Sequence, residues 1–295
     1  MTSRSFFDRL QDRLWTVRLQ REALDLPSSV GCAAMGGSIS GEMAWPQACA
    51  ALADGLISSE HFRRFRAVVD VVETLGPCDG RHHARLIRAA GHEDWLEDVK
   101  MLDLSSWGDP MLWPNVLLGV PHAMAPTSLR YLSHALWLRD QGLIPDKGRV
   151  VEIGVGYGGL AGVNALVSDT KTTLVDLPDV ERAAMRMLRE NDLQHAAIPS
   201  AQSEGQEMFD CVISNYAFTE LSIELQDEML TKYIARSRHG MILSNAEVFS
   251  QQIGGRSNDQ ILSALRAHGV TASYHAEHPL FSPADRATGS VLFVW

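Results

Sequence analysis

The most constraining feature of this chain is a short apolar run that leads into a glycine-rich turn at residues 149–159. Val150, Val151 and Ile153 form a run that is too short for a helix, and a helix-like segment follows over residues 160–166. Glycines allow positive φ and leave main-chain N–H groups open to a ligand. The stretch therefore predicts a strand, a tight ligand-binding turn and the start of a helix.

Two classes of nucleoside cofactor use such a turn, and an acid inside the strand discriminates between them. Gly154, Gly156 and Gly159 match G-x-G-x-x-G, the fingerprint of dinucleotide-binding domains. A carboxylate at Glu152 offers a pyrophosphate nothing, whereas S-adenosylmethionine brings an ammonium and a sulfonium. Asp176, about 20 residues after the glycines, can accept hydrogen bonds from the ribose hydroxyls of either cofactor. We therefore predict S-adenosylmethionine as the cofactor.

Three segments resemble a known protein family. They are residues 151–161, with a Gly-Tyr-Gly-Gly step, residues 175–180, with Asp-Leu-Pro, and residues 214–221, with Asn-Tyr-Ala-Phe-Thr-Glu. Together they resemble the bacterial sugar O-methyltransferase family of class I S-adenosylmethionine-dependent methyltransferases, and the Asp-Leu-Pro step is also similar to plant-type small-molecule O-methyltransferases. The resemblance covers residues 126–295. It implies methyl transfer to a hydroxyl of a sugar or another small polar metabolite, in natural-product biosynthesis.

The pattern of predicted elements divides the chain into two parts. Residues 1–125 are predicted to be helical, starting with an amphipathic helix over 5–24 that packs on a second subunit or on its own core. After residue 126, strands and helices alternate, and two closing strands follow without a helix between them. We predict an α/β fold with a seven-stranded Rossmann-like methyltransferase sheet at 126–295. The helical N-terminal domain at 1–125 would serve in dimerisation or as a substrate lid.

Two irregular segments in the N-terminal part are candidates for covering the site. Residues 27–41 are rich in Gly, Ser and Pro and form a loop that is either a lid or a linker. Residues 107–126 combine tryptophans and prolines, and such aromatic segments roof pockets or join domains. We favour a roof, with Trp113 against the substrate.

Ligands of open α/β sheets lie beyond the carboxyl ends of the strands, so the candidate cofactor residues follow the predicted strands. They are Glu152, Gly154, Gly156, Tyr157, Gly158, Asp176, Leu177 and Asn215, together with Arg130 from the segment before the first strand. Glu152 would support the cofactor's ammonium. Arg130 would pair with a carboxylate of cofactor or substrate, or form a structural salt bridge. Tyr157 would either cover the cofactor or pack beneath it.

Methyl transfer requires an aligned acceptor, exclusion of water and, for a hydroxyl, a base. Glu220, after the fourth predicted strand, is the candidate base, although it could also cap the next helix or pair with an arginine. Histidines are further candidates because they titrate near neutral pH: His122, and His275 or His278 after the sixth strand. We assign Glu220, Tyr216 and His122 as catalytic, and Asn215, Tyr216, Glu247 and Trp113 as substrate-binding.

Composition and charge narrow the class of partner. The net charge of −10 argues against nucleic acid, and no apolar run approaches the length of a membrane span. Four cysteines, Cys32, Cys49, Cys78 and Cys211, contain no C-x-x-C pair, which indicates a reduced cytoplasmic protein without a zinc site. We expect a small-molecule acceptor, no metal, no nucleic-acid or membrane partner, and a homodimer formed through the N-terminal helices.

Three alternative functions stay open. Methylation of nitrogen in a small amine, guanidine or amino acid uses the same fold, and Glu220 and Glu247 would suit a cationic acceptor. A nicotinamide-dependent oxidoreductase is disfavoured by Glu152 and by the closing pair of strands. A non-catalytic methyltransferase-like partner subunit would keep the glycine turn without turnover.

Overall fold

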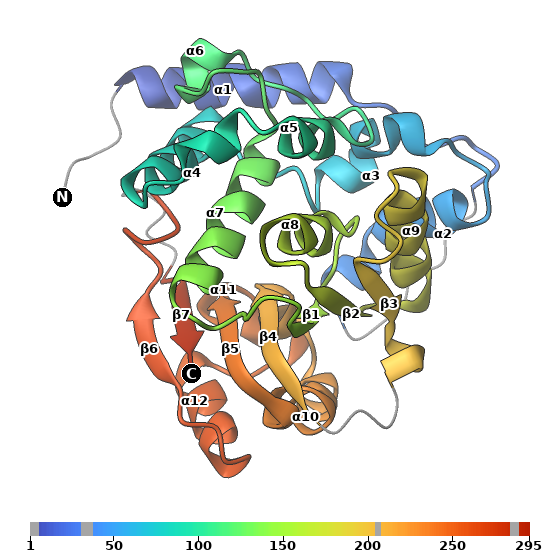
Figure 1. The fold of residues 1–295 in the computed structure, drawn as a ribbon. Coiled ribbons are helices and arrows are strands. Elements are labelled where there is room, and N and C mark those ends of the chain that lie inside the picture. The colour runs from blue at the N-terminus through green and yellow to red at the C-terminus, as the bar shows by residue number, and fades with distance from the viewer. Residues whose placement is uncertain (1–5, 31–37, 204–207, 284–288) are drawn as a thin grey trace.

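A single mixed sheet forms the centre of the C-terminal part (Figure 1). The computed structural model describes residues 6–30, 38–203, 208–283 and 289–295. Within these residues the sheet has seven strands in the order β3-β2-β1-β4-β5-β7-β6. The strands are β1 (Arg149–Ile153), β2 (Lys171–Val175), β3 (Ala197–Pro199), β4 (Phe209–Asn215), β5 (Ser237–Ser244), β6 (Ser273–Ala276) and β7 (Val291–Val294).

The direction of the strands matches the predicted fold class. β1 to β5 are parallel, and β7 lies antiparallel between β5 and β6. The two closing strands pair with each other without a helix between them, as predicted, and the seven-stranded Rossmann-like sheet of the α/β prediction is confirmed. Because β1, β2, β4 and β5 run in the same direction, their carboxyl ends lie at one edge of the sheet, where ligands of such sheets bind.

Alternating side chains of β1 supply both faces of the sheet, as the two-residue period of a strand requires. Val150 joins a hydrophobic cluster with residues of α7, α8 and α9, whereas Val151 joins a second cluster with residues of α10 and α12. The helices that flank the sheet are α7 (Pro126–Asp140), α8 (Gly159–Ser168), α9 (Pro178–Glu190), α10 (Ile223–Lys232), α11 (Ala246–Ile253) and α12 (Asn258–Ala267). The sheet is therefore covered by helices on both faces.

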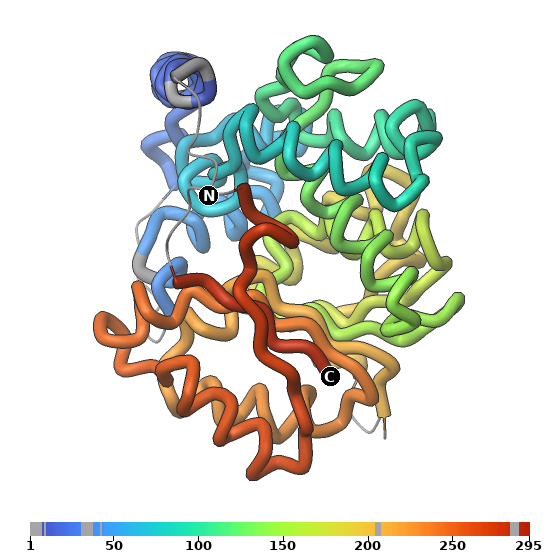
Figure 2. Tube along the Cα trace, turned by 90° about the vertical axis from the view of Figure 1, so that its left-hand side faces the viewer, coloured from blue at the N-terminus to red at the C-terminus, as the bar shows by residue number. Residues whose placement is uncertain are grey.

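The N-terminal part is helical, as predicted, within its described residues. Its helices are α1 (Phe6–Glu22), α2 (Trp45–Ala53), α3 (Arg66–Val69), α4 (Pro77–Ala89), α5 (Val99–Ser106) and α6 (Asn115–Leu118), joined in part by short 3-10 turns. α2 packs on α9, α4 on α7 and α5 on α8. Figure 2 shows this layer above the sheet, and its buried side chains belong to the same cluster as Val150. None of the helices in the described part of the chain has the length and hydropathy that a membrane span requires.

One N-terminal segment reaches the ligand edge of the sheet. The backbone N–H of Ile39 donates to the carbonyl of Glu220 over 3.2 Å, and Ser38 forms an antiparallel bridge with Leu221. Residues 38–41 belong to the predicted loop at 27–41, of which residues 31–37 lie outside the described part. The C-terminal end of this loop therefore lies against the segment that follows β4.

Candidate active site

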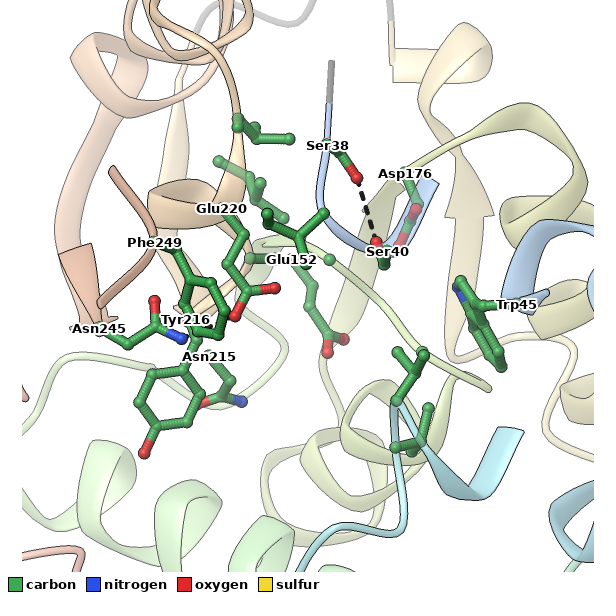
Figure 3. Close-up of a pocket in the computed structure, with 18 of the residues that line it drawn as sticks. Ser38, Ser40, Trp45, Glu152, Asp176, Asn215, Tyr216, Glu220, Asn245 and Phe249 are labelled. Carbon is green, nitrogen blue, oxygen red and sulfur yellow. Dashed lines mark hydrogen bonds between the residues drawn. The ribbon is translucent and has the colours of Figure 1, made fainter. Parts of the chain in front are cut away.

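A cavity of about 800 Å³ opens at the carboxyl edge of the sheet (Figure 3). It is lined by the residues that follow β1, β2, β4 and β5, by residues 38–45 and 70–74 from the N-terminal part, and by Glu277 and Ser290 beside the closing strands. The volume is within the range of sites that enclose a small ligand or cofactor. The segments that form it come from both parts of the chain.

The turn after β1 forms part of the cavity wall through two of its glycines. Gly154 and Gly156 line the cavity with φ of +84° and +53°. A Cβ on Gly154 would lie 2.0 Å from the Cβ of Ala217, so the turn packs directly on the segment after β4. Gly158, with φ of +83°, precedes α8 and faces Ala184 instead, outside the cavity. Only the first half of the predicted turn can therefore contact a ligand in this cavity.

Tyr157 is buried behind the turn and does not line the cavity. The guanidinium of Arg63 lies 4.3 Å from the centre of its ring, and the ring fills the space that a Cβ on Gly159 would need. Of the two positions considered from sequence, packing beneath the turn is the one observed. Tyr157 supports the turn and does not cover the cavity.

Glu152 presents a buried carboxyl group to the cavity. The residue is 3% exposed, and its Oε2 has no hydrogen-bond partner in the described part of the protein. Burial, and secondarily the nearby Asp176, raises the pKa of this carboxyl well above its usual range. A buried acceptor without a donor is costly, and a cationic ligand group would supply one. Glu152 fits the ammonium of an amino-acid moiety.

Asp176 is held at the end of β2 by two backbone donors. The N–H of Val155 donates to Oδ2 over 2.9 Å, and the N–H of Leu177 donates to Oδ1 over 2.8 Å. Burial raises the pKa of Asp176 to about 6, although these hydrogen bonds oppose the shift. Asp176 and Leu177 both line the cavity. The fixed carboxylate can still accept ligand hydroxyls through its remaining lone pairs.

Arg130 on α7 is the one basic side chain among the described residues that line the cavity. Its Nε is buried without a hydrogen-bond partner, and no acidic side chain among the described residues forms an ion pair with it. Its guanidinium lies 5.6 Å from the ring of Tyr131. The structural salt bridge considered from sequence is thus not observed within the described part. A ligand carboxylate would complete this site with paired hydrogen bonds.

Beyond β4, Tyr216 and a residue that sequence reasoning missed form a pair. The Tyr216 hydroxyl donates to Oε1 of Glu277 over 2.6 Å, and both residues line the cavity. Tyr216 has a φ of +73°, an uncommon value for a bulky residue. Glu277 follows β6 directly, so an acid after a predicted strand was the available signal. His275 and His278 were considered there instead, and neither lines the cavity.

Glu220 enters the cavity with its carboxyl group held by an amide. Asn245 Nδ2 donates to Glu220 Oε1 over 2.7 Å, and Asn245 Oδ1 accepts from the Thr219 hydroxyl over 2.6 Å. Burial raises the pKa of Glu220, and the hydrogen bond from Asn245 opposes this. Figure 3 shows Glu220 beside Phe249 of α11, with Asn215 and Tyr216 on the same side of the cavity. The predicted base and orienting residues therefore share one wall.

Three other predicted site residues lie outside the cavity. His122 is exposed, and Glu247 is exposed and accepts from Asn258 Nδ2 over 3.1 Å. Trp113 is buried elsewhere, with the Arg18 guanidinium 5.7 Å from its ring. No residue of the expected roof at 107–126 lines the cavity. That role falls to the segment 38–45, because its bridge to Leu221 holds it across the edge of the sheet.

Comparison with known proteins concerns the fold. No protein-family model and no curated protein matches the sequence. Solved structures with a similar fold include an O-methyltransferase family protein from Burkholderia thailandensis, with 14% identity, 57% of this chain and 59% of that chain covered, and a TM-score of 0.40. A TehB-like SAM-dependent methyltransferase from Corynebacterium glutamicum shows 17% identity, with 54% and 85% covered and a TM-score of 0.40.

A third similar structure is the geranyl diphosphate C-methyltransferase from Streptomyces coelicolor A3(2), solved in complex with Mg²⁺, geranyl-S-thiolodiphosphate and S-adenosyl-L-homocysteine. It shows 12% identity, with 55% of this chain and 74% of that chain covered and a TM-score of 0.41. Similarity at this level adds nothing about the reaction, so the function has to be argued from the cavity itself.

Proposed function

We propose that this protein is an S-adenosylmethionine-dependent methyltransferase that acts on a small molecule. The observation that carries this proposal is the joint presence of Glu152, Arg130 and Asp176 in one cavity at the ligand edge of the sheet. They match, in that order, the ammonium, the carboxylate and the ribose hydroxyls of an aminoacyl nucleoside. The pyrophosphate of a dinucleotide would instead meet the buried Glu152 carboxyl.

The residues around the turn fit this cofactor in shape as well as in charge. Bound S-adenosylmethionine supplies a methyl group on a positively charged sulfur. Gly154 and Gly156 leave the backbone of the turn open to it, since neither carries a Cβ. Asp176 is oriented by the N–H groups of Val155 and Leu177 before any ligand arrives. Such preorganisation lowers the cost of binding.

Residues beyond β4 would serve the acceptor. Glu220 can accept a proton from it, since its carboxyl group is partly buried and its hydrogen-bond partner among the described residues is the neutral Asn245 amide. Asn215 and Tyr216 lie on the same wall and would orient the acceptor. The segment 38–45 would limit access of water. The sequence resemblance favours a hydroxyl of a sugar or similar metabolite in natural-product biosynthesis, with the nitrogen of a small amine as the alternative.

The proposed homodimer involves the first helix. Leu10, Leu14 and Val17 on α1 are 42%, 58% and 64% exposed, and their spacing places them along one side of the helix. An apolar stripe of this kind is a candidate contact with a second copy. Light scattering of the protein and of a Leu14→Glu variant measures whether this stripe holds two copies together.

Calorimetric titration tests the proposed function. We expect S-adenosylmethionine and S-adenosylhomocysteine to bind and NAD not to bind. Asp176→Ala should weaken the binding of both compounds by about 10- to 100-fold, since hydrogen bonds to a charged group contribute roughly 1.5–3 kcal/mol. Asp179→Ala is the control, because Asp179 pairs with Arg182 at the surface outside the cavity. Binding of NAD alone would refute the proposal. Cofactor binding without turnover on any acceptor would indicate a non-catalytic subunit.

A further inference from the structure

The acceptor half of the cavity is distinguishable from the cofactor half. We define the acceptor half by Tyr216, Glu220, Asn245 and Phe249, which Figure 3 shows on one side of Glu152, with Asp176 and Trp45 on the other. The division follows the sheet, because the acceptor half comes from the ends of β4 and β5 whereas Asp176 follows β2. The charged side chains of the two halves can therefore be considered separately.

Acidic groups dominate the cavity wall. Among the described residues, the lining contains five acids, Asp70, Glu152, Asp176, Glu220 and Glu277, and one base, Arg130. In the proposed function Glu152, Asp176 and Arg130 are engaged by the cofactor. The charged groups left for the acceptor are then carboxyl groups, without a lysine or arginine in the described lining to balance them. A phosphorylated or carboxylate-bearing acceptor would be repelled from this half.

Glu220 has the surroundings of a cation-binding carboxylate. Its described polar partner is the neutral Asn245 amide, and no lysine or arginine among the described residues forms an ion pair with it. Burial deprives a carboxylate of part of its hydration, and a bound cation compensates for this loss by ion pairing. Its backbone is fixed by the hydrogen bond from Ile39, so the carboxyl group cannot easily withdraw.

Aromatic rings complete these surroundings. Phe249 lies beside Glu220, and Tyr216 lies on the same wall, with its ring fixed by the 2.6 Å hydrogen bond to Glu277. The faces of aromatic rings attract an ammonium ion at distances within about 6 Å. Among the described residues, no lysine or arginine lines this half of the cavity. A carboxylate flanked by rings in such surroundings is complementary to an organic ammonium and not to a neutral polyol.

We propose that the acceptor is a small primary or secondary amine, which the Glu220 carboxylate binds as its ammonium ion in the acceptor half. The inference rests on the proposed methyltransferase function and specifies its substrate class. Glu220 takes one proton from the ammonium and frees the nitrogen lone pair. That lone pair forms the new nitrogen–carbon bond while the carbon–sulfur bond breaks and its electron pair stays on sulfur. The nitrogen leaves methylated and positively charged.

Probes that share a phenethyl skeleton and end in a cationic, a neutral or an anionic group test this inference. The protein is first saturated with S-adenosylhomocysteine and then titrated with phenethylamine, 2-phenylethanol or 3-phenylpropanoate. We expect the amine to bind at least tenfold more tightly than the alcohol and the carboxylate not to bind. With S-adenosylmethionine, mass spectrometry should find the methyl group on the amine nitrogen. Equal binding of amine and alcohol, tighter binding of the alcohol, or binding of none of the three would overturn the inference.

Two variants separate the acceptor from the cofactor. Glu220→Gln keeps an oxygen for the Asn245 amide and should lose the preference for the amine while the affinity for S-adenosylhomocysteine stays unchanged. Glu228→Gln is the control, since Glu228 pairs with Lys232 on the outer surface of α10. A protein that fails to bind S-adenosylhomocysteine would contradict the proposed function. A protein that binds it, but whose Glu220→Gln variant keeps the amine preference, would contradict the inference alone.

Discussion

The two ends of the cavity are built in different ways. Five residues of the cofactor end, Glu152, Gly154, Gly156, Asp176 and Leu177, lie within 26 consecutive residues of β1, α8 and β2, and Arg130 of α7 joins them. The acceptor end joins residues that follow β4, β5 and β6, which are more than 60 positions apart in the sequence at their extremes, Tyr216 and Glu277. Most of the cofactor end is local in sequence, whereas the acceptor end is assembled from separate segments only when the chain folds.

The polar groups of the two ends also differ in their state before a ligand arrives. Glu152 and Arg130 each present a buried atom without a partner in the described residues. Glu220 and Tyr216, by contrast, already share hydrogen bonds with Asn245 and Glu277. The cofactor end is therefore completed by its ligand, whereas the acceptor end is a network of side chains that can change without disturbing the cofactor. Substitutions can test this separation.

The largest expected effect comes from the residue that joins the two ends. Gly154→Ala would place a Cβ 2.0 Å from the Cβ of Ala217, at a φ of +84°. Because both atoms belong to tightly packed backbone segments, we expect a loss of stability of about 3 kcal/mol or more, and loss of binding at both ends. Urea denaturation and titration with S-adenosylhomocysteine measure the two effects.

Gly142→Ala provides the matched control for backbone conformation. Gly142 has a φ of +69°, and a Cβ there would meet no atom within 4 Å. Its substitution should cost only about 1 kcal/mol, the conformational strain of a left-handed residue, and leave binding unchanged. Equal losses in the two variants would show that the contact with Ala217 does not matter.

The difference between the two ends explains how far the sequence alone could lead. The strand before Gly154, Asp176 and the alternation of strands and helices are local signals, and they predicted the fold and the cofactor end of the candidate site. Glu220 and Tyr216 follow a strand and were found by the same logic. Each of these predictions needed only the rule that ligands lie beyond the carboxyl ends of strands.

Residues whose position depends on contacts between distant segments could not be placed in this way. His122 and Trp113 have suitable chemistry, yet they lie outside the cavity because the segment 107–126 packs among the N-terminal helices. Ser38 lines the cavity because it forms a bridge with Leu221, which lies 183 residues further along the chain. No periodicity or spacing reports such a contact.

Glu152→Gln should affect the cofactor end alone. Removing the charge that would hold the ammonium should weaken the binding of S-adenosylhomocysteine by about 10- to 100-fold. Binding of the amine probe would fall only as far as it depends on bound cofactor. If Glu152→Gln left the affinity for S-adenosylhomocysteine intact, the assignment of the ammonium to this carboxyl would be wrong.

The same variant has a pH signature in stability. Burial raises the pKa of Glu152 in the folded protein, so its ionised form costs stability once the pH exceeds the unfolded value of about 4.3. Glu152→Gln removes this cost. We therefore expect the ligand-free variant and the natural protein to have the same free energy of unfolding near pH 4. At pH 8 the variant should be more stable by at least about 1 kcal/mol, as measured by denaturant titrations.

The smallest effect should come from Tyr216→Phe at the acceptor end. The substitution keeps the ring and removes only the hydroxyl that donates to Glu277 over 2.6 Å. Because the hydrogen bond holds the ring in place beside the acceptor, its loss should raise the KM for the acceptor by about 5- to 10-fold, or roughly 1 kcal/mol, and leave the affinity for S-adenosylhomocysteine unchanged. Tyr274→Phe on β6 is the control, since Tyr274 is 48% exposed and outside the cavity. If Tyr216→Phe weakened cofactor and acceptor alike, the two ends would be coupled through the turn after β4, and their separation would have to be abandoned.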